Sequence, residues 1–223
     1  MKSNFKKWNW MLLSGISLLL MAIFAGLAMG LYYPKLIDVQ ANQVPELKSE
    51  LNGFIWSFTM VAILDLVVSI GFYNSFLDLN KWMNLFTFLC RMGYTFLLLM
   101  SLKELYLLSY IGEYTNNEVI ASMSYFNRNW SISLIVFGLH LVTLSMLVCK
   151  SNDLPKWVSY LIMFAGILYF SHHLLLNLLP SYVIIKDTIN NMIALPCAAG
   201  ELVLAFYLIK LKFTVHSFSD SAQ

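Results

Sequence analysis

The chain has 223 residues, a length that suits one domain of ordinary size. Hydrophobic residues make up 59% of it and charged residues 12%, whereas soluble domains contain roughly 45–50% and about 25%. A water-soluble fold of this size cannot bury so much apolar surface, and a net charge of +2 without any block of like charges excludes nucleic acid as an expected partner.

Six apolar runs follow one another along the chain, and each is long enough to cross the hydrocarbon core of a bilayer as a helix. They cover about residues 11–33, 53–75, 82–104, 129–149, 156–178 and 191–211. The first run follows Lys2, Lys6 and Lys7 and so resembles a signal peptide, but it exceeds the about 7–15 residues of a signal h-region. We therefore expect an all-α integral membrane protein, with a single six-helix transmembrane bundle over residues 11–212.

Lysine and arginine residues are distributed unevenly between the two sides that six spans define. With the N-terminus in the cytoplasm, eight lie inside and four outside, and an excess of these residues is typical of the cytoplasmic side. The inner set is Lys2, Lys6, Lys7, Lys81, Lys150, Lys156, Lys210 and Lys212, and the outer set is Lys35, Lys48, Arg128 and Lys186. The segment 1–10 and the tail 213–223 are therefore both predicted to be cytoplasmic.

The six tryptophans agree with this topology, because each falls at a predicted membrane boundary, where an amphipathic indole ring is favoured. The inner ones are Trp8, Trp10, Trp82 and Trp157, and the outer ones are Trp56 and Trp130. The inner loops, 77–81 and 150–156, are short. The outer loops, near 34–52 and 109–128, are longer and more polar, and they have room for a short interfacial helix or a lid.

Four of the predicted spans carry one ionisable residue close to their centre. Asp65, Arg91, His140 and Glu201 lie within about two residues of the middles of spans two, three, four and six. At a rise of about 1.5 Å per residue they share a slab several ångströms thick. A charge at that depth costs about 2.5–3.5 kcal/mol on insertion scales, so each charged group must face protein or water and have a partner.

One of the two carboxylates at this depth lacks an evident counterion. Arg91 cannot lose its proton and so requires an anionic neighbour, which is either Asp65 on the adjacent span or Glu201. The other carboxylate must be protonated, bind a cation or meet a protonated His140. The layer is therefore either a structural network that locks the bundle or a substrate site, proton relay or cation site.

Two further features lie in the last two spans. His172 and His173 are adjacent and so point about 100° apart on a helix, which does not suit shared coordination of one metal ion. Pro196 removes a backbone hydrogen bond from the sixth span, as happens at the broken helices of transporters and at ordinary packing kinks. The three cysteines stand far apart as small apolar residues, so we expect neither a metal ion nor a cofactor.

Spans two, three, four and six each contain a short motif. The motifs are Ile63–Val68 (ILDLVV), Arg91–Thr95 (RMGYT), Phe137–Leu141 (FGLHL) followed by Leu154–Lys156 (LPK), and Leu195–Pro196 with Gly200–Leu202. In this order and spacing they resemble the bacterial membrane family defined by domain of unknown function 4386. The resemblance implies that the family's polar positions are Asp65, Arg91, Tyr94, His140 and Glu201.

The chain departs from that family pattern at two places. His172 stands where the family usually has an acidic residue in span five, and Tyr207 stands where it often has tryptophan late in span six. Any role that depends on the span-five carboxylate is therefore not expected here. The resemblance implies a multi-pass protein of the bacterial inner membrane, but it implies no activity.

Three functions fit these observations, and no GxSxG, P-loop or GxGxxG motif separates them. The first is a non-enzymatic membrane component, such as a sensor, immunity factor or assembly partner, which suits the small size and short inner loops; its expected partner is the lipid bilayer, and a small-molecule, ion or lipid ligand is left open. The second is a small ion- or proton-coupled transporter built around the surplus carboxylate. The third is a membrane-embedded enzyme that uses His140 and a carboxylate as acid and base on a lipid-like substrate.

Overall fold

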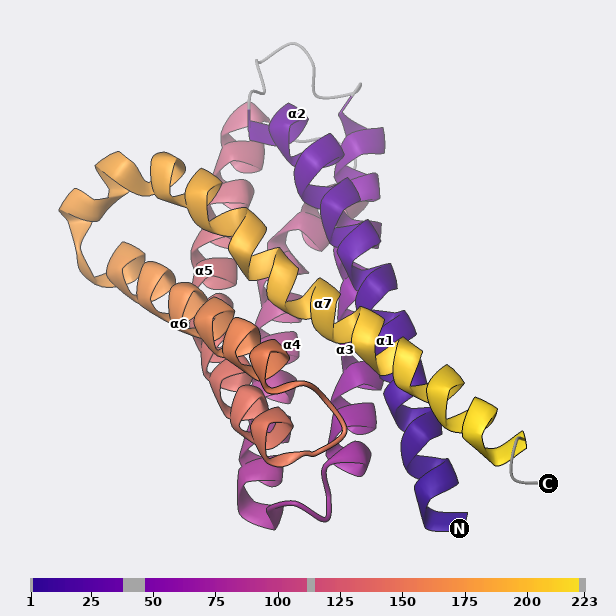
Figure 1. Ribbon diagram of the computed structural model, residues 1–223. Helices are drawn as coiled ribbons and strands as arrows, with labels where there is room; N and C mark the ends of the chain where they lie inside the picture. The colour runs from indigo at the N-terminus through magenta and orange to yellow at the C-terminus, as the bar shows by residue number, and fades with distance from the viewer. Residues whose placement is uncertain (1, 38–46, 112–114, 221–223) are drawn as a thin grey trace.

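The computed structural model describes residues 2–37, 47–111 and 115–220, and these residues form helices joined by short turns, with no strand among them (Figure 1). In chain order the elements are α1 (Lys2–Gly26), η1 (Leu27–Tyr32), α2 (Tyr33–Ile37), α3 (Lys48–Ser75), α4 (Lys81–Ile111), α5 (Asn116–Lys150), α6 (Lys156–Leu178), η2 (Pro180–Ile185) and α7 (Lys186–Asp220). The all-α class expected from the sequence is confirmed.

Five helical stretches are long and apolar enough to cross a membrane within the described residues. They are Lys7–Ile37, Lys48–Ser75, Lys81–Tyr110, Asn117–Lys150 and Lys156–Leu178. These stretches contain the first five predicted spans, so the chain is a multi-pass membrane protein. The sixth predicted span, 191–211, lies within the continuous helix α7, and its crossing of the membrane stays a prediction.

The long helices form a closed ring. Each packs against its neighbours in sequence, from α1 against α3 through α4, α5 and α6 to α7, and α7 in turn packs against α1. Figure 1 shows α7 running obliquely across the bundle, from η2 beside the end of α6 to the end at which α1 begins. Side chains that point inward from different helices therefore meet in the middle of this ring.

The first membrane-spanning stretch continues through a proline because its turn is widened. Residues Leu27–Tyr32 form a π-helix, in which the backbone N–H of Tyr33 bonds to the carbonyl of Ala28, five residues earlier. Pro34 has no N–H, and its ring clashes with the carbonyl four residues earlier in a regular α-helix. The wider turn accommodates the ring and lets the helix continue into α2.

The predicted outer loop at 109–128 is helical over most of its length. α4 extends to Ile111 and α5 begins at Asn116, so residues 116–128 are helical. Thr115 caps α5: its side chain accepts a hydrogen bond from the backbone N–H of Glu118, and the Glu118 carboxylate accepts one from the backbone N–H of Thr115 at 2.6 Å. This capping box, a TxxE pattern, is a sequence signal that hydropathy overlooks.

Other parts of the predicted loops and tail cannot be compared with the structure. Residues 38–46 and 112–114 of the outer loops and residues 221–223 of the tail lie outside the described residues. The tail predicted from residue 213 starts as a helical continuation of α7, which ends at Asp220.

Glycines bring α5 and α6 into close contact. A Cβ atom added at Gly138 would lie 2.6 Å from the backbone nitrogen of Phe170. One added at Gly166 would lie 2.8 Å from the backbone nitrogen of Val142. Small residues of this kind let membrane helices approach until their backbones touch.

Aromatic side chains fill the core between α3 and α5, on the side of the midplane towards the start of α3. Phe54 packs edge-on against Phe58 and Phe126, each at a centroid distance of 5.0 Å. Trp130 stacks on Phe126 at 5.7 Å, so its ring packs within the bundle. Trp82, by contrast, is 78% exposed in the first turn of α4, and its position at the membrane boundary stays a prediction.

Candidate functional site

Arg91 is the centre of a buried polar network that links three helices. Its side chain is 1% exposed, and that of Asp65 on α3 is fully buried. The Arg91 Nε donates to Asp65 Oδ1 at 2.7 Å, and Nη2 lies 2.5 Å from the same oxygen. The other carboxylate oxygen, Oδ2, accepts a hydrogen bond from Thr95 Oγ1 on α4. The counterion that the sequence left open for Arg91 is therefore Asp65.

His140 on α5 completes the network as a neutral side chain. Its Nε2 lies 3.0 Å from Arg91 Nη1, and its Nδ1 lies 2.9 Å from the backbone carbonyl of Thr87 on α4. A guanidinium can only donate a hydrogen bond and a carbonyl oxygen can only accept one. The hydrogen-bond pattern therefore assigns the proton to Nδ1 and the lone pair to Nε2, which excludes a doubly protonated imidazole in this arrangement.

Aromatic rings and a methionine cover the remaining surface of the guanidinium. The Arg91 Cζ lies 5.7 Å from the ring centroid of Phe72 on α3 and 5.5 Å from that of Phe137 on α5. Its Nη2 is 3.9 Å from the sulfur of Met21 on α1. Cation–π contacts of this kind are stronger where water is excluded. The guanidinium thus contacts side chains from α1, α3 and α5.

The local sequence explains why α4 carries three members of the network. Thr87, Arg91 and Thr95 are spaced four residues apart, so they lie along one face of the helix. Thr87 and Thr95 were missed by sequence reasoning, which considered ionisable residues only. Their four-residue spacing around Arg91 is the signal that would have identified them.

Tyr94 is close to this network but belongs to an aromatic stack. Its ring is 6% exposed and packs on Phe137 at a centroid distance of 4.6 Å. Phe137 also packs edge-on against Tyr169 of α6 at 5.5 Å. Tyr94 interacts electrostatically with Asp65, Arg91 and Glu201.

Glu201 lies apart from the Asp65–Arg91–His140 network. It is half-buried, and among the residues that the structure describes its carboxylate makes no hydrogen bond or ion pair. It interacts electrostatically with Arg91 and Asp65, so the four residues predicted at the midplane lie in one region of the bundle. Three of them form a hydrogen-bonded network, and the fourth does not join it.

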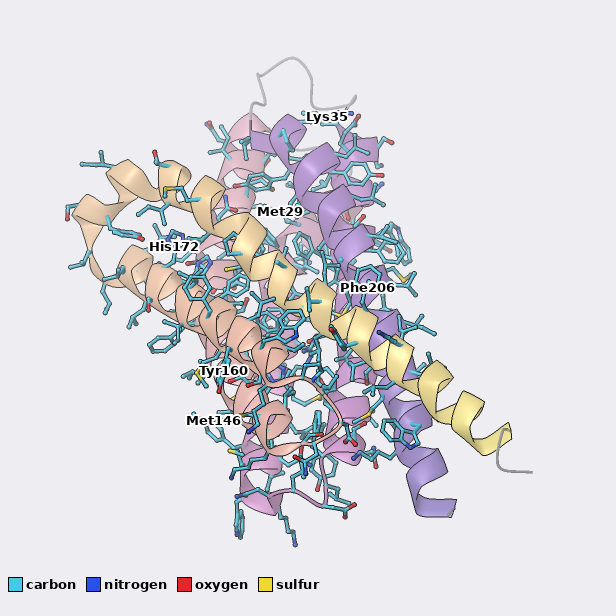
Figure 2. All side chains as sticks on the ribbon, viewed as in Figure 1. Met29, Lys35, Met146, Tyr160, His172 and Phe206 are labelled. Carbon is cyan, nitrogen blue, oxygen red and sulfur yellow. The ribbon has the colours of Figure 1, made fainter. Side chains whose placement is uncertain are left out.

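His172 and His173 belong to a second polar cluster, at the end of α6 that leads into η2 (Figure 2). His172 Nδ1 is 3.0 Å from the hydroxyl of Tyr182 on η2. His173 Nδ1 is 3.0 Å from Ser131 Oγ on α5, which also accepts a hydrogen bond from Asn177 at 2.9 Å. Each histidine thus binds a different hydroxyl group.

The described residues contain no group of three or more His, Cys, Asp and Glu side chains placed to hold a metal ion. Cys90 and Cys197 are buried and Cys149 is partly buried, and all three are free thiols. The burial of Cys90 and Cys197 agrees with their predicted role as small apolar residues.

Comparison with known proteins places the chain in a family. Neither the curated proteins nor the solved structures gave a match. A family model described as "Domain of unknown function (DUF4386)" matches residues 13–211, which include every candidate residue of the midplane and the whole ring of helices except its ends. Because the match covers most of its length, the chain belongs to the DUF4386 family.

Proposed function

We propose that the chain is a non-enzymatic component of a bacterial inner membrane, crossing it six times with both ends in the cytoplasm. Contacts between distant segments support the even number of crossings. Lys7, near the start of α1, pairs with Asp153 in the α5–α6 turn at 2.6 Å. Trp157, at the start of α6, packs on Tyr207 late in α7 at 5.6 Å. The lysine bias supports the cytoplasmic assignment of this end.

The Asp65–Arg91–His140 network supports a structural role, and this is the observation that carries the proposal. Its one positive and one negative charge compensate each other, and the three side chains are at most 1% exposed. Both nitrogens of His140 are hydrogen-bonded, so no lone pair is left to act as a general base. This arrangement locks α3, α4 and α5 together and offers little to a substrate.

Complementation of a strain that lacks the gene tests the proposal. The double variant Asp65→Asn/Arg91→Met removes both charges together, so it avoids an unpaired charge in the interior. We expect it to fold, to reach the membrane and to restore the phenotype of the deletion strain. A double variant that folds as well as the wild type and fails to complement would contradict a structural role for the network.

A second candidate function is an ion- or proton-coupled transporter, and the position of Glu201 favours it. This carboxylate lies outside the compensated network, on the continuous helix α7, about one and a half turns after Pro196, which cannot donate a backbone hydrogen bond within that helix. Proteoliposomes with an imposed pH gradient test this function through an internal pH-sensitive dye. If the chain is such a transporter, the wild type should show a proton flux that the Glu201→Gln variant lacks. Equal flux in the wild type and the variant excludes it.

A further inference from the structure

Glu201 faces the interior of the ring of helices. On the same helix, Cys197, Leu204 and Leu208 are at most 1% exposed, whereas Phe206, labelled in Figure 2, is 61% exposed. With 3.6 residues per turn, Glu201 points within about 60° of each of the three buried residues and about 140° away from Phe206. The carboxylate therefore points towards the core while Phe206 faces outward.

The neighbours of α7 determine what lies in that direction. Gly200 abuts α6, because a Cβ atom added there would lie 3.0 Å from the Cβ of Ala165. Ala205 abuts α1, because its carbonyl oxygen lies 2.9 Å from the Cβ position of Gly15. Glu201 lies between these two contacts on the helix surface. It thus points between α1 and α6 into the middle of the ring.

Two tyrosine side chains lie in the same region of the bundle as this carboxylate. Tyr94 of α4 and Tyr169 of α6 pack on the same ring, that of Phe137, at centroid distances of 4.6 and 5.5 Å. Both interact electrostatically with Glu201. A phenol hydroxyl can donate a hydrogen bond to a carboxylate or accept one from a carboxylic acid, so it can accompany either protonation state.

The charges that face this interior leave Glu201 without compensation. Arg91 is bound to Asp65 at 2.5 Å, and His140 is held neutral by its two hydrogen bonds. Among the described residues, helices α3 to α7 bring ionisable groups to this region. These groups are Asp65 from α3, Arg91 and Tyr94 from α4, His140 from α5, Tyr169 from α6, and Cys197 and Glu201 from α7. Helix α1 brings the uncharged thioether of Met21. An ionised Glu201 would give this group a net negative charge inside the membrane.

We propose that Glu201 is a proton-binding site in the middle of the ring, with Tyr94 and Tyr169 as the hydroxyl groups beside it. One carboxylate oxygen takes up a proton from water to form an O–H bond, and the reverse step returns the proton to water. The site is separate from the structural network of the proposed function and does not require transport. It gives the chain one group inside the membrane whose charge responds to protons.

Infrared difference spectroscopy on the full chain in lipid vesicles tests the proposal directly, because a protonated carboxyl group has its own C=O stretching band. Spectra are recorded while the buffer is exchanged between mildly alkaline and mildly acidic. We expect a carboxylic acid band in the wild type that is absent from Glu201→Gln. The matched control, Glu104→Gln, replaces a partly buried glutamate of α4 and should keep the band. Tyr94→Phe and Tyr169→Phe should shift its frequency.

Each outcome of this experiment decides the proposal. Identical difference spectra in the wild type and in a well-folded Glu201→Gln variant would overturn it. If Glu201→Gln does not fold, Glu201→Asp replaces it: a shifted band supports the site, and an unshifted one contradicts it. Because the readout is spectroscopic, absence of flux in the transport assay leaves this test unaffected.

Discussion

In the α3–α4–α5 half of the bundle each ionisable group at the midplane has a hydrogen-bonded partner, whereas Glu201 in the α6–α7 half has none among the described residues. The order of helices around the ring explains the difference. α4 packs between α3 and α5, so Arg91 can reach Asp65 on one side and His140 on the other. α7 packs between α6 and α1, and among the side chains that the structure describes neither of these helices brings a cation to Glu201.

The comparison teaches that depth in the membrane does not by itself make a network. Asp65 and Glu201 were predicted at the same level, and either carboxylate was a candidate for pairing with Arg91. Adjacency within the ring decided which carboxylate became the counterion. The consequence is a division of roles, with a compensated cluster suited to stabilising the fold and a separate acid suited to exchanging a proton.

The largest expected effect comes from breaking the compensated half. Arg91→Met leaves Asp65 buried without its counterion, and loss of one partner of a buried ion pair costs about 3–5 kcal/mol. We expect the free energy of unfolding, measured by denaturant titration in detergent micelles, to fall by that amount. Adding Asp65→Asn should recover most of the free energy of unfolding that Arg91→Met loses. A double variant as unstable as Arg91→Met would show that the two charges are not coupled.

A smaller effect is expected at the contact that joins the two halves. Gly138→Ala places a methyl group against the backbone of α6, and overpacking of this kind costs about 1–3 kcal/mol. Gly93→Ala on α4 is the matched control, because the nearest atom to its Cβ position is a Val136 methyl at 3.7 Å, an ordinary contact. Unfolding midpoints of the two variants provide the measurement. Equal destabilisation would mean that α5 and α6 tolerate a wider separation.

Replacement of Glu201 should have little effect on stability, in contrast to Arg91→Met. Glu201→Gln retains the shape of the protonated acid and removes no hydrogen bond among the described residues, so the change should stay below the roughly 1 kcal/mol of a typical hydrogen bond. The same denaturant titration measures it. A loss as large as that of Arg91→Met would place Glu201 in the structural network and remove the contrast between the two halves.

The smallest effect is expected at the end of the bundle that holds Lys7. The Lys7–Asp153 pair is 2.6 Å long, but both side chains are about a quarter exposed, at 26% and 24%. Pairs of this kind contribute about 0–1 kcal/mol, so Lys7→Ala should shift the unfolding midpoint only slightly. The shift should disappear at high salt, where such pairs are screened. A larger, salt-independent loss would indicate that Lys7 has a packing role in addition to its charge.

The sequence by itself indicated most of the helical residues, which candidate residues fall near the centres of their spans, and which family the chain resembles. Apolar runs report membrane spans because lipid offers no partner to an exposed backbone. Axial position then follows from counting at about 1.5 Å per residue, so Asp65, Arg91, His140 and Glu201 were expected at a similar depth. The capping box at Thr115 and the threonines spaced four residues from Arg91 could also be recognised in the sequence, although hydropathy alone does not detect them.

Only the tertiary structure decided how the helices are rotated and which of them are neighbours. Those choices depend on contacts between residues far apart in sequence, such as Gly138 against α6 and Gly15 against α7. They selected Asp65 as the counterion of Arg91, fixed the tautomer of His140 and directed Tyr94 onto Phe137. A hydrogen bond requires its atoms within about 3 Å, a precision that depth along one helix does not provide and that packing between helices does.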